Sequence, residues 1–316
     1  MINNKLNLYI NSFGQEIFIP ILNHKSQRQG KKIVLTCMSH GNEIIGAMAA
    51  LEIFNKVKID PNFAGELIVL SCLNQSGMEQ ISRFFEADNQ YDTNSQNLNR
   101  NFGGDQKTLT SLVANKVLDY IIDQKPDLVV DCHSYAFNSL VHIILDRPGG
   151  ALESQIKKIA FDSKIPFYLE YKTETIQEQM LDKCLSNQLL LKGIKAITVE
   201  LGPQIGFNLS QLNIATKALS NFFCDTKFDL YAEQNCEIQI GQGYYRQEIK
   251  NDSEYCGIIK PLVEIGKLVQ KNTIIAEIYN FYGEKTYDII MPRDGYIIVW
   301  AMAGYTYPNL CIAVIV

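Results

Sequence analysis

The stretch KIVLTCMSHGNEIIGAMAALEIF, residues 32–54, decides the fold because it joins a buried strand to a helix. The segment 32–38 is short and nearly all apolar, as strands buried within a sheet are. Residues 43–56 carry apolar side chains at the spacing typical of a helix. His40 and Glu43 lie in the connection, at the carboxyl end of the strand, where α/β proteins place their sites.

The alternation of apolar runs and helical stretches continues along the chain. Further strands are expected at residues 66–73, 127–133, 140–146 and 195–201. Further helices are expected at residues 108–124, 151–162, 176–191 and 208–223. Strands interleaved with helices predict an α/β layer fold. Residues 86–107 show neither pattern, and irregular stretches of that length usually carry function or are disordered.

Composition excludes several classes of function. A length of 316 residues with 47% hydrophobic content is enough for a sizeable core and favours about two domains. The net charge of −5, from 29 basic and 34 acidic residues, provides no basic surface for nucleic acid or anionic lipid. No apolar segment reaches the roughly 18 residues that span a bilayer, and the first residues lack a signal-peptide pattern. We therefore expect a cytoplasmic protein that binds neither nucleic acid nor membranes, with eight scattered cysteines as reduced core thiols.

Helical spacing ends near residue 225, and short apolar runs separated by glycines follow. We therefore predict a catalytic α/β domain over residues 1–225 and a small all-β domain over residues 226–316. A weak repeat relates GIIKPLVEIG, residues 257–266, to GYIIVWAMAG, residues 295–304, which predicts a small sandwich of two similar halves. The domain resembles the barrel-sandwich carriers of biotin and lipoate, but it lacks their modified-lysine motif. We expect no attached cofactor.

Histidines at the ends of two expected strands predict a metal site. His40 follows one strand, and His133 closes another in VVDCHSY. With Glu43 they supply two imidazoles and one carboxylate, the ligand set of catalytic zinc sites that leave one position open for water. Each residue also has a structural explanation, because the helix dipole favours a glutamate at a helix start and a strand-end histidine can simply be hydrogen-bonded.

Two further motifs carry polar groups suited to catalysis. Glu200 ends the expected strand in KAITVELG, where a carboxylate is costly unless it is paired, solvated or functional. Beside a metal-bound water, such a carboxylate acts as a general acid and base. In QNLNRNFGG, Arg100 offers a planar fork and Asn99 a neutral donor, both suited to a carboxylate. Exposed to solvent, Glu200 and Arg100 would instead be ordinary surface charges.

The motifs HGNE, NLNRNF, DCHS and TVELG occur in the order and approximate separations of the succinylglutamate desuccinylase and aspartoacylase family. The sequence resembles that family over residues 30–225. The resemblance implies a zinc-carboxypeptidase-like fold, a three-layer mixed sheet with helices on both faces. It also implies individual roles: zinc ligands (His40, Glu43, His133), a pair that holds the substrate carboxylate (Asn99, Arg100), the catalytic acid and base (Glu200) and a group that polarises the scissile carbonyl (Arg83).

Two departures from the family pattern bear on the loop and the substrate. Gly103 stands where the family often has a proline, so the loop after Arg100 lacks that constraint. Aspartoacylases use an arginine shortly before the catalytic glutamate to bind a second carboxylate, whereas this segment contains only Lys192 and Lys195. An acidic acyl group is therefore not implied.

These expectations combine into a hypothesis of function. The chain is expected to be a zinc-dependent amidohydrolase, with one zinc per chain, that removes the acyl group from a small N-acyl amino acid. A metallocarboxypeptidase acting on short peptides is an alternative, because the same ligand set and arginine suit either bond. A catalytically silent binding or scaffold protein is the alternative from another class. Assembly into a homo-oligomer is left open.

Overall fold

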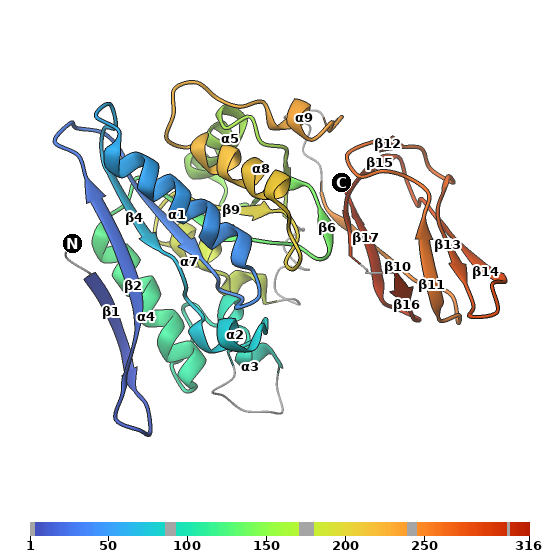
Figure 1. The fold of residues 1–316 in the computed structure, drawn as a ribbon, viewed down its shortest axis with the longest axis horizontal. Coiled ribbons are helices and arrows are strands. Elements are labelled where there is room, and N and C mark those ends of the chain that lie inside the picture. Colours follow the sequence, from blue (N-terminus) through green and yellow to red (C-terminus); the bar gives the residue numbers. More distant parts are fainter. Residues whose placement is uncertain (1–3, 86–92, 171–179, 239–244, 302–303) are drawn as a thin grey trace.

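The computed structural model describes residues 4–85, 93–170, 180–238, 245–301 and 304–316. Its largest element is an eight-stranded mixed sheet with the strand order β1-β2-β4-β3-β5-β9-β7-β8 (Figure 1). Its strands are β1 (Asn4–Ile10), β2 (Glu16–Lys25), β3 (Lys32–Cys37), β4 (Glu66–Leu70), β5 (Leu128–His133), β7 (Val141–Leu145), β8 (Phe167–Leu169) and β9 (Ala196–Leu201).

Strand direction determines where side chains at strand ends lie. Strands β4, β3, β5 and β9 are parallel and nearly all their residues are buried, which is why they are short and apolar. Their carboxyl ends meet at one edge, where His133 pairs directly with Glu200. Strand β7 runs antiparallel to β9, with Ile144 opposite Thr198, and β8 runs parallel to β7. The carboxyl ends of β7 and β8 therefore lie at the opposite end of the strands, where the central parallel strands begin.

Helices cover both faces of the sheet (Figure 1). Helices α1 and α8 lie side by side on one face. Helices α4 and α7 lie on the other face, where Ser186 of α7 is 3.2 Å from the Thr198 hydroxyl of β9. The helical segments are α1 (Ile44–Ile59), α2 (Gln75–Gln80), α3 (Thr93–Gln96), η1 (Leu98–Arg100), α4 (Leu109–Gln124), α5 (Gly150–Asp162), η2 (Leu181–Lys183), α7 (Leu185–Leu191), α8 (Leu209–Ser220) and α9 (Leu230–Glu233).

The C-terminal part contains two small antiparallel sheets around a shared apolar core. One has the order β10-β17-β15-β12 and the other β14-β13-β11-β16. The internal repeat is present, because β11 begins at Gly257 and β15 at Gly295, and the turns that follow contain Gly266 and Gly304 with positive φ. The strands are β10 (Gln247–Lys250), β11 (Gly257–Pro261), β12 (Leu268–Val269), β13 (Ile274–Tyr279), β14 (Lys285–Ile290), β15 (Gly295–Trp300), β16 (Tyr305–Thr306) and β17 (Cys311–Ile315).

The two parts of the chain share backbone pairing and an apolar cluster. Strand β6 (Asn138–Ser139), between β5 and β7 in the sequence, pairs with β15 of the C-terminal part. Leu140 and Tyr168 from the α/β part are buried in one cluster with Ile298 and Val314. The C-terminal part is therefore packed directly against the α/β part.

The predicted fold class is confirmed, with a mixed sheet, helices on both faces and additional antiparallel sheets at the C-terminus. The five expected strands correspond to β3, β4, β5, β7 and β9. The helix expected over residues 176–191 is confirmed only in part within its described portion, because it is not continuous. There η2 and α7 are separated at Cys184, whose backbone is extended, and the Leu185 amide donates to Asn99 Oδ1 (3.0 Å). Residues 176–179 lie outside the described residues.

The sequence does not predict strands β1, β2 and β8. Strand β2 lies near the sheet edge and mixes exposed, half-buried and buried residues, so it lacks the continuous apolar run of the central strands. Strand β8 has only three residues, Phe167–Leu169. The irregular stretch expected over residues 86–107 contains the short segments α3 and η1, while residues 86–92 lie outside the described residues.

Candidate active site

His40 lies in a tightly packed connection between β3 and α1. The Glu43 amide donates to the His40 carbonyl (3.1 Å), which closes a turn just before the helix. Gly41 approaches α2 so closely that a Cβ atom there would lie 2.1 Å from the carbonyl carbon of Gly77. The motif HGNE therefore needs its glycine for packing.

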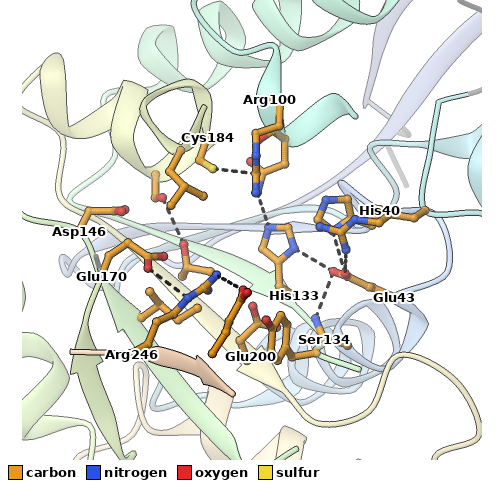
Figure 2. A pocket seen from close by; sticks show the side chains of 18 residues that line it. His40, Glu43, Arg100, His133, Ser134, Asp146, Glu170, Cys184, Glu200 and Arg246 are labelled. Atoms are coloured by element: carbon orange, nitrogen blue, oxygen red, sulfur yellow. Dashed lines mark hydrogen bonds and ion pairs between the residues drawn. The ribbon is translucent and has the colours of Figure 1, made fainter. Parts of the chain in front are cut away.

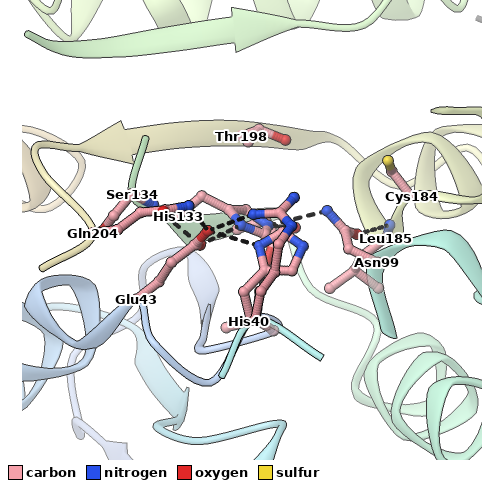
Figure 3. Close-up of polar contacts among 12 residues, drawn as sticks. His40, Glu43, Asn99, His133, Ser134, Cys184, Leu185, Thr198 and Gln204 are labelled. Carbon is pink, nitrogen blue, oxygen red and sulfur yellow. Dashed lines mark hydrogen bonds and ion pairs between the residues drawn. The ribbon is translucent and has the colours of Figure 1, made fainter. Parts of the chain in front are cut away.

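His40, Glu43 and His133 converge as predicted (Figure 3). Nδ1 of His40 lies 2.7 Å from one carboxylate oxygen of Glu43, and Nδ1 of His133 lies 2.8 Å from the other. All three side chains are buried. One potential ligand atom from each residue lies within 4.8 Å of the others.

The outer nitrogen of each imidazole has its own partner. Nε2 of His40 lies 3.1 Å from Asn97 Oδ1, and Nε2 of His133 lies 3.0 Å from Asp131 Oδ2. The Thr36 hydroxyl donates to the second Asp131 oxygen (2.7 Å). These bonds orient both rings with Nδ1 toward the Glu43 carboxylate, as partners of metal-binding histidines do.

This donor set fits a divalent metal. Two oriented imidazoles and one carboxylate are the protein ligands of catalytic zinc sites. Ligand atoms around a tetrahedral zinc lie about 3.4 Å apart, given metal–ligand bonds of about 2.1 Å. The 2.7 and 2.8 Å separations between the histidine nitrogens and the Glu43 oxygens would need only a small widening.

Charges within the cluster set its protonation. Burial lowers the pKa of His40 to about 4, and the nearby Arg83 acts in the same direction. Burial would also lower the pKa of His133, but the carboxylates of Asp131 and Glu43 outweigh it and raise that pKa well above its ordinary value. Burial would raise the pKa of Glu43, yet the two histidines hold it well below its usual range. Glu43 is therefore an ionised carboxylate, the form that binds metal.

Arg83 lies at the His40–Glu43–His133 cluster. Its guanidinium donates to Glu43 (3.2 Å), and its side chain is one-third exposed. Gln204 Nε2 and the Ser134 amide also donate to Glu43, at 3.2 and 3.1 Å. The sequence analysis assigns no role to either residue, although Ser134 is the last residue of the DCHS motif and Gln204 follows the TVELG motif by two residues.

Glu200 lies beside this cluster, at the carboxyl end of β9. It is 6% exposed, and its Oε2 has no hydrogen-bond partner among the described residues. Burial raises the pKa of Glu200 to about 8, although the positive charges of His133, Arg83 and Arg246 act against it. This carboxyl group therefore exchanges a proton near neutral pH, as a general acid and base requires.

The structure also brings Asn99 and Arg100 to the site, on the short segment η1. Asn99 accepts a hydrogen bond from the Leu185 amide, which orients its Nδ2 to within 3.2 Å of His133 Nε2. Arg100 donates to the Asn99 carbonyl (2.7 Å) and to Cys184 Sγ (3.1 Å). These contacts fix the Asn–Arg pair against the start of α7.

One cavity of about 260 Å³ is lined by all seven predicted site residues (Figure 2). Three lining residues that the sequence does not predict lie away from His40 and Glu43, namely Asp146, Glu170 and Arg246 (Figure 2). Glu248, which is also not predicted, lies 3.7 Å from Arg246 and lines the cavity too. Asp146 ends the strand expected over residues 140–146, so the signal that identifies Glu200 would also have found it. Arg246 and Glu248 come from the C-terminal part, where no local motif marks them.

Within the described part of the chain, the helices are too short or too polar for any of them to cross a membrane.

Solved structures with the same fold cover nearly the whole chain. A succinylglutamate desuccinylase from Silicibacter sp. TM1040 is 21% identical with a TM-score of 0.75, over 98% of this chain and 92% of that chain. A succinylglutamate desuccinylase/aspartoacylase from Rhodobacter sphaeroides is 18% identical with a TM-score of 0.73, over 98% and 93%. The product-bound ectoine utilization protein EutE (DoeB) from Ruegeria pomeroyi is 20% identical with a TM-score of 0.74, over 99% and 93%. No curated protein sequence matches significantly.

The profile of the succinylglutamate desuccinylase/aspartoacylase catalytic domain matches residues 29–224. That range is more than half of the chain and includes every residue predicted for the site. The resemblance drawn from four short motifs is thereby confirmed. The chain belongs to the succinylglutamate desuccinylase/aspartoacylase family of deacylases.

Proposed function

We propose that this chain is a zinc-dependent amidohydrolase that cleaves the amide bond of an N-acylated amino acid. The observation that carries the proposal is the meeting of three groups in one cavity. These groups are the His40–Glu43–His133 cluster, the buried Glu200 carboxyl group and the Asn99–Arg100 pair. Membership in a deacylase family supports the same reaction class. A cavity of about 260 Å³ suits a small substrate.

His40, Glu43 and His133 would hold one zinc ion per chain. When bound, zinc would lower the pKa of a water molecule toward neutrality and polarise the scissile carbonyl. Arg83, which contacts Glu43, would add positive charge beside that carbonyl oxygen.

Glu200 would move the protons of the reaction. Its free Oε2 would accept a proton from the attacking water and return it to the nitrogen of the departing amine. Arg100 and Asn99 would bind the substrate carboxylate, which holds the amide carbon within reach of Glu200. Because Cys184 and the start of α7 support this pair, its position is fixed before the substrate binds.

The division of the chain at residue 225 is part of the proposal. Residues 1–225 would form the catalytic domain, and residues 226–316 would form a β-domain that completes the cavity. The contribution of Arg246 and Glu248 to the lining supports this division.

The test is hydrolysis by the zinc-loaded protein of a panel of N-acetyl and N-succinyl amino acids, with dipeptides as the alternative substrates. Glu200→Gln should lower kcat by at least about 10²-fold, because the amide keeps the size of the side chain but cannot shuttle a proton. Elemental analysis should show the same zinc content in this variant as in the wild type.

The matched control is Glu264→Gln, which removes an exposed carboxylate and should leave kcat unchanged. Preferential cleavage of dipeptides would favour the carboxypeptidase alternative. A scaffold protein would show no turnover of either class. A Glu200→Gln variant with near-normal kcat and bound zinc would remove Glu200 from the mechanism.

A further inference from the structure

The wall of the cavity farthest from the metal-ligand cluster carries an excess of negative charge. Asp146 and Glu170 follow the neighbouring parallel strands β7 and β8, and the Glu170 amide donates to the Leu145 carbonyl (2.9 Å). Both carboxylates are buried, at 6% and 5% exposure, and both line the cavity. Strand pairing therefore holds two acidic side chains next to each other at one end of the cavity (Figure 2).

The nearby arginine is already shared between two carboxylates. Arg246 lies 3.5 Å from Glu170 and 3.7 Å from Glu248. Asp146 accepts a hydrogen bond from Asn187 (2.8 Å) and has no ion pair among the described residues. Among the described residues, this wall contains the carboxyl groups of Asp146, Glu170 and Glu248 and one cation, Arg246. A substrate that carried a further carboxylate, besides the one bound by Arg100, would be repelled there.

Within the described part of the chain, no positively charged side chain forms an ion pair with Asp146. Burial raises the pKa of Asp146 to about 7, and the negative charge of Glu170 adds to this effect, while hydrogen bonds from Ser186 and Asn187 oppose it. A substrate cation next to this carboxyl group would favour its ionised form. Two other buried polar atoms of the lining, Glu200 Oε2 and Ser134 Oγ, have no hydrogen-bond partner among the described residues. The cavity is therefore prepared for a polar ligand.

The distance along the sheet limits the length of that ligand. Glu200 pairs with His142 across β9 and β7, and Asp146 lies four residues further along the chain from His142. Four residues of extended chain span about 13 Å. Allowing about 3 Å for a hydrogen bond at each end leaves a separation on the order of 7 Å between the reacting amide and a group bound by Asp146. A lysine or ornithine side chain has about this reach.

We propose that Asp146 and Glu170 form a subsite for a positively charged side chain, so that the preferred substrates are diamino acids acylated on the α-nitrogen. This inference rests on the proposed function and names the substrate class for it. Arg100 would bind the α-carboxylate, Glu200 would face the amide, and the side-chain ammonium group would lie against Asp146. Acidic amino acids would be disfavoured by the same wall.

The test measures binding of the amino-acid products, which does not depend on the acyl group or on turnover. Calorimetry with the zinc-loaded protein compares L-lysine with L-norleucine, L-ornithine with L-norvaline, and both diamino acids with L-glutamate. Each neutral analogue keeps the carbon chain and lacks only the ammonium group. We expect the better diamino acid to bind more tightly than its neutral analogue by on the order of tenfold or more, and more tightly than glutamate.

Asp146→Asn should reduce that preference to about threefold or less while leaving the affinity for the neutral analogue nearly unchanged. Glu170→Gln is the second variant, and thermal unfolding of both verifies the fold. The matched control is Asp225→Asn, which removes an exposed carboxylate and should keep the full preference.

Three results would overturn the inference. The first is that neither diamino acid binds more tightly than its neutral analogue. The second is tighter binding of glutamate, and the third is an unchanged preference in folded Asp146→Asn. The absence of binding by every amino acid in the series would overturn it as well. Hydrolysis assays keep the two proposals separate. Turnover of neutral or acidic N-acyl amino acids without a preference for diamino acids would overturn the subsite alone, whereas no turnover of any acylated amino acid would overturn the proposed function.

Discussion

At the scale of single residues, the cavity holds carboxyl groups in surroundings that oppose ionisation. Burial raises the pKa of Asp146 from 3.8 to about 7 and that of Glu200 from 4.5 to about 8. A carboxyl group with a raised pKa binds its proton more tightly in the folded chain than in the unfolded chain. The stability from this proton is fully present below the unfolded pKa and is lost as pH rises through the folded pKa.

Asp146→Asn should therefore change how stability depends on pH. Between about pH 4 and pH 7 the wild type loses stability, because Asp146 ionises in the unfolded chain while it keeps its proton in the folded chain. The variant cannot ionise, so its unfolding free energy relative to wild type should rise across that window and level off above it. The gain should be on the order of 2 kcal/mol. Chemical denaturation at a series of pH values measures it.

Asp225→Asn controls for the loss of one negative charge at an exposed position, and it should keep the wild-type pH dependence. Parallel stability curves for Asp146→Asn and wild type would show that Asp146 is ionised throughout this range.

At the scale of elements, the connection between β3 and α1 depends on close packing against α2. The connection presents His40, and the next residue is in contact with the backbone of Gly77. The first residues of α1 have no side-chain cap, since Glu43 at the cap position uses its carboxylate for the two histidines. The start of this helix therefore gives up capping stability so that Glu43 can contact both histidines.

Gly41→Ala should disrupt this connection. Its new Cβ would lie 2.1 Å from the Gly77 carbonyl carbon, which forces the β3–α1 connection and α2 apart. We expect the unfolding free energy to fall by about 2 kcal/mol or more and zinc affinity to fall with it, because His40 moves away from Glu43. Denaturant unfolding and zinc titration with a competing chelator measure the two effects.

The matched control is Gly104→Ala, where the nearest atom to the new Cβ would be the Asn101 carbonyl oxygen at 3.1 Å. Its zinc affinity should equal that of the wild type. Unchanged zinc affinity in Gly41→Ala would mean that His40 keeps its place independently of α2.

At the scale of the whole molecule, the C-terminal part alters the chemistry of a cavity built mainly by the α/β part. Strand β6 and the shared apolar cluster hold the two parts together. Arg246, immediately before β10, reaches the cavity and is close enough to Glu200 to lower its pKa against the effect of burial. The C-terminal part therefore influences the protonation of Glu200 in the α/β part.

Arg246→Gln should move the acid limb of the kcat/KM profile to higher pH. Loss of the positive charge raises the pKa of Glu200 further, so the carboxylate that accepts a proton is available only in more alkaline solution. Rates measured across the pH range at subsaturating substrate report this shift. The control Lys250→Gln removes a cation from the same region, on β10, where its side chain is 56% exposed, and should leave the profile unchanged. An unshifted acid limb in Arg246→Gln would mean that the C-terminal part does not affect the proton transfer.

The sequence by itself determined the central strands, the fold class and the two histidines and glutamate that come together. Central parallel strands are buried on both faces, so they appear as apolar runs, and their carboxyl ends must meet at one edge. His133 and Glu200 are neighbours for that reason. His40 and Glu43 are close because they flank a single turn. These relations are local or follow from strand order, so residue patterns can predict them.

Only the tertiary structure decided what surrounds that cluster. Strand β7 runs antiparallel to β9, which carries Asp146 along the sheet face to the far end of the cavity instead of to the edge beside Glu200. Arg246 reaches the cavity from the C-terminal part, immediately before β10, through contacts between the two parts of the chain. Strand direction and domain packing depend on the burial of side chains far apart in the sequence, so no short motif encodes them. The charge of the substrate subsite therefore follows from the assembled fold.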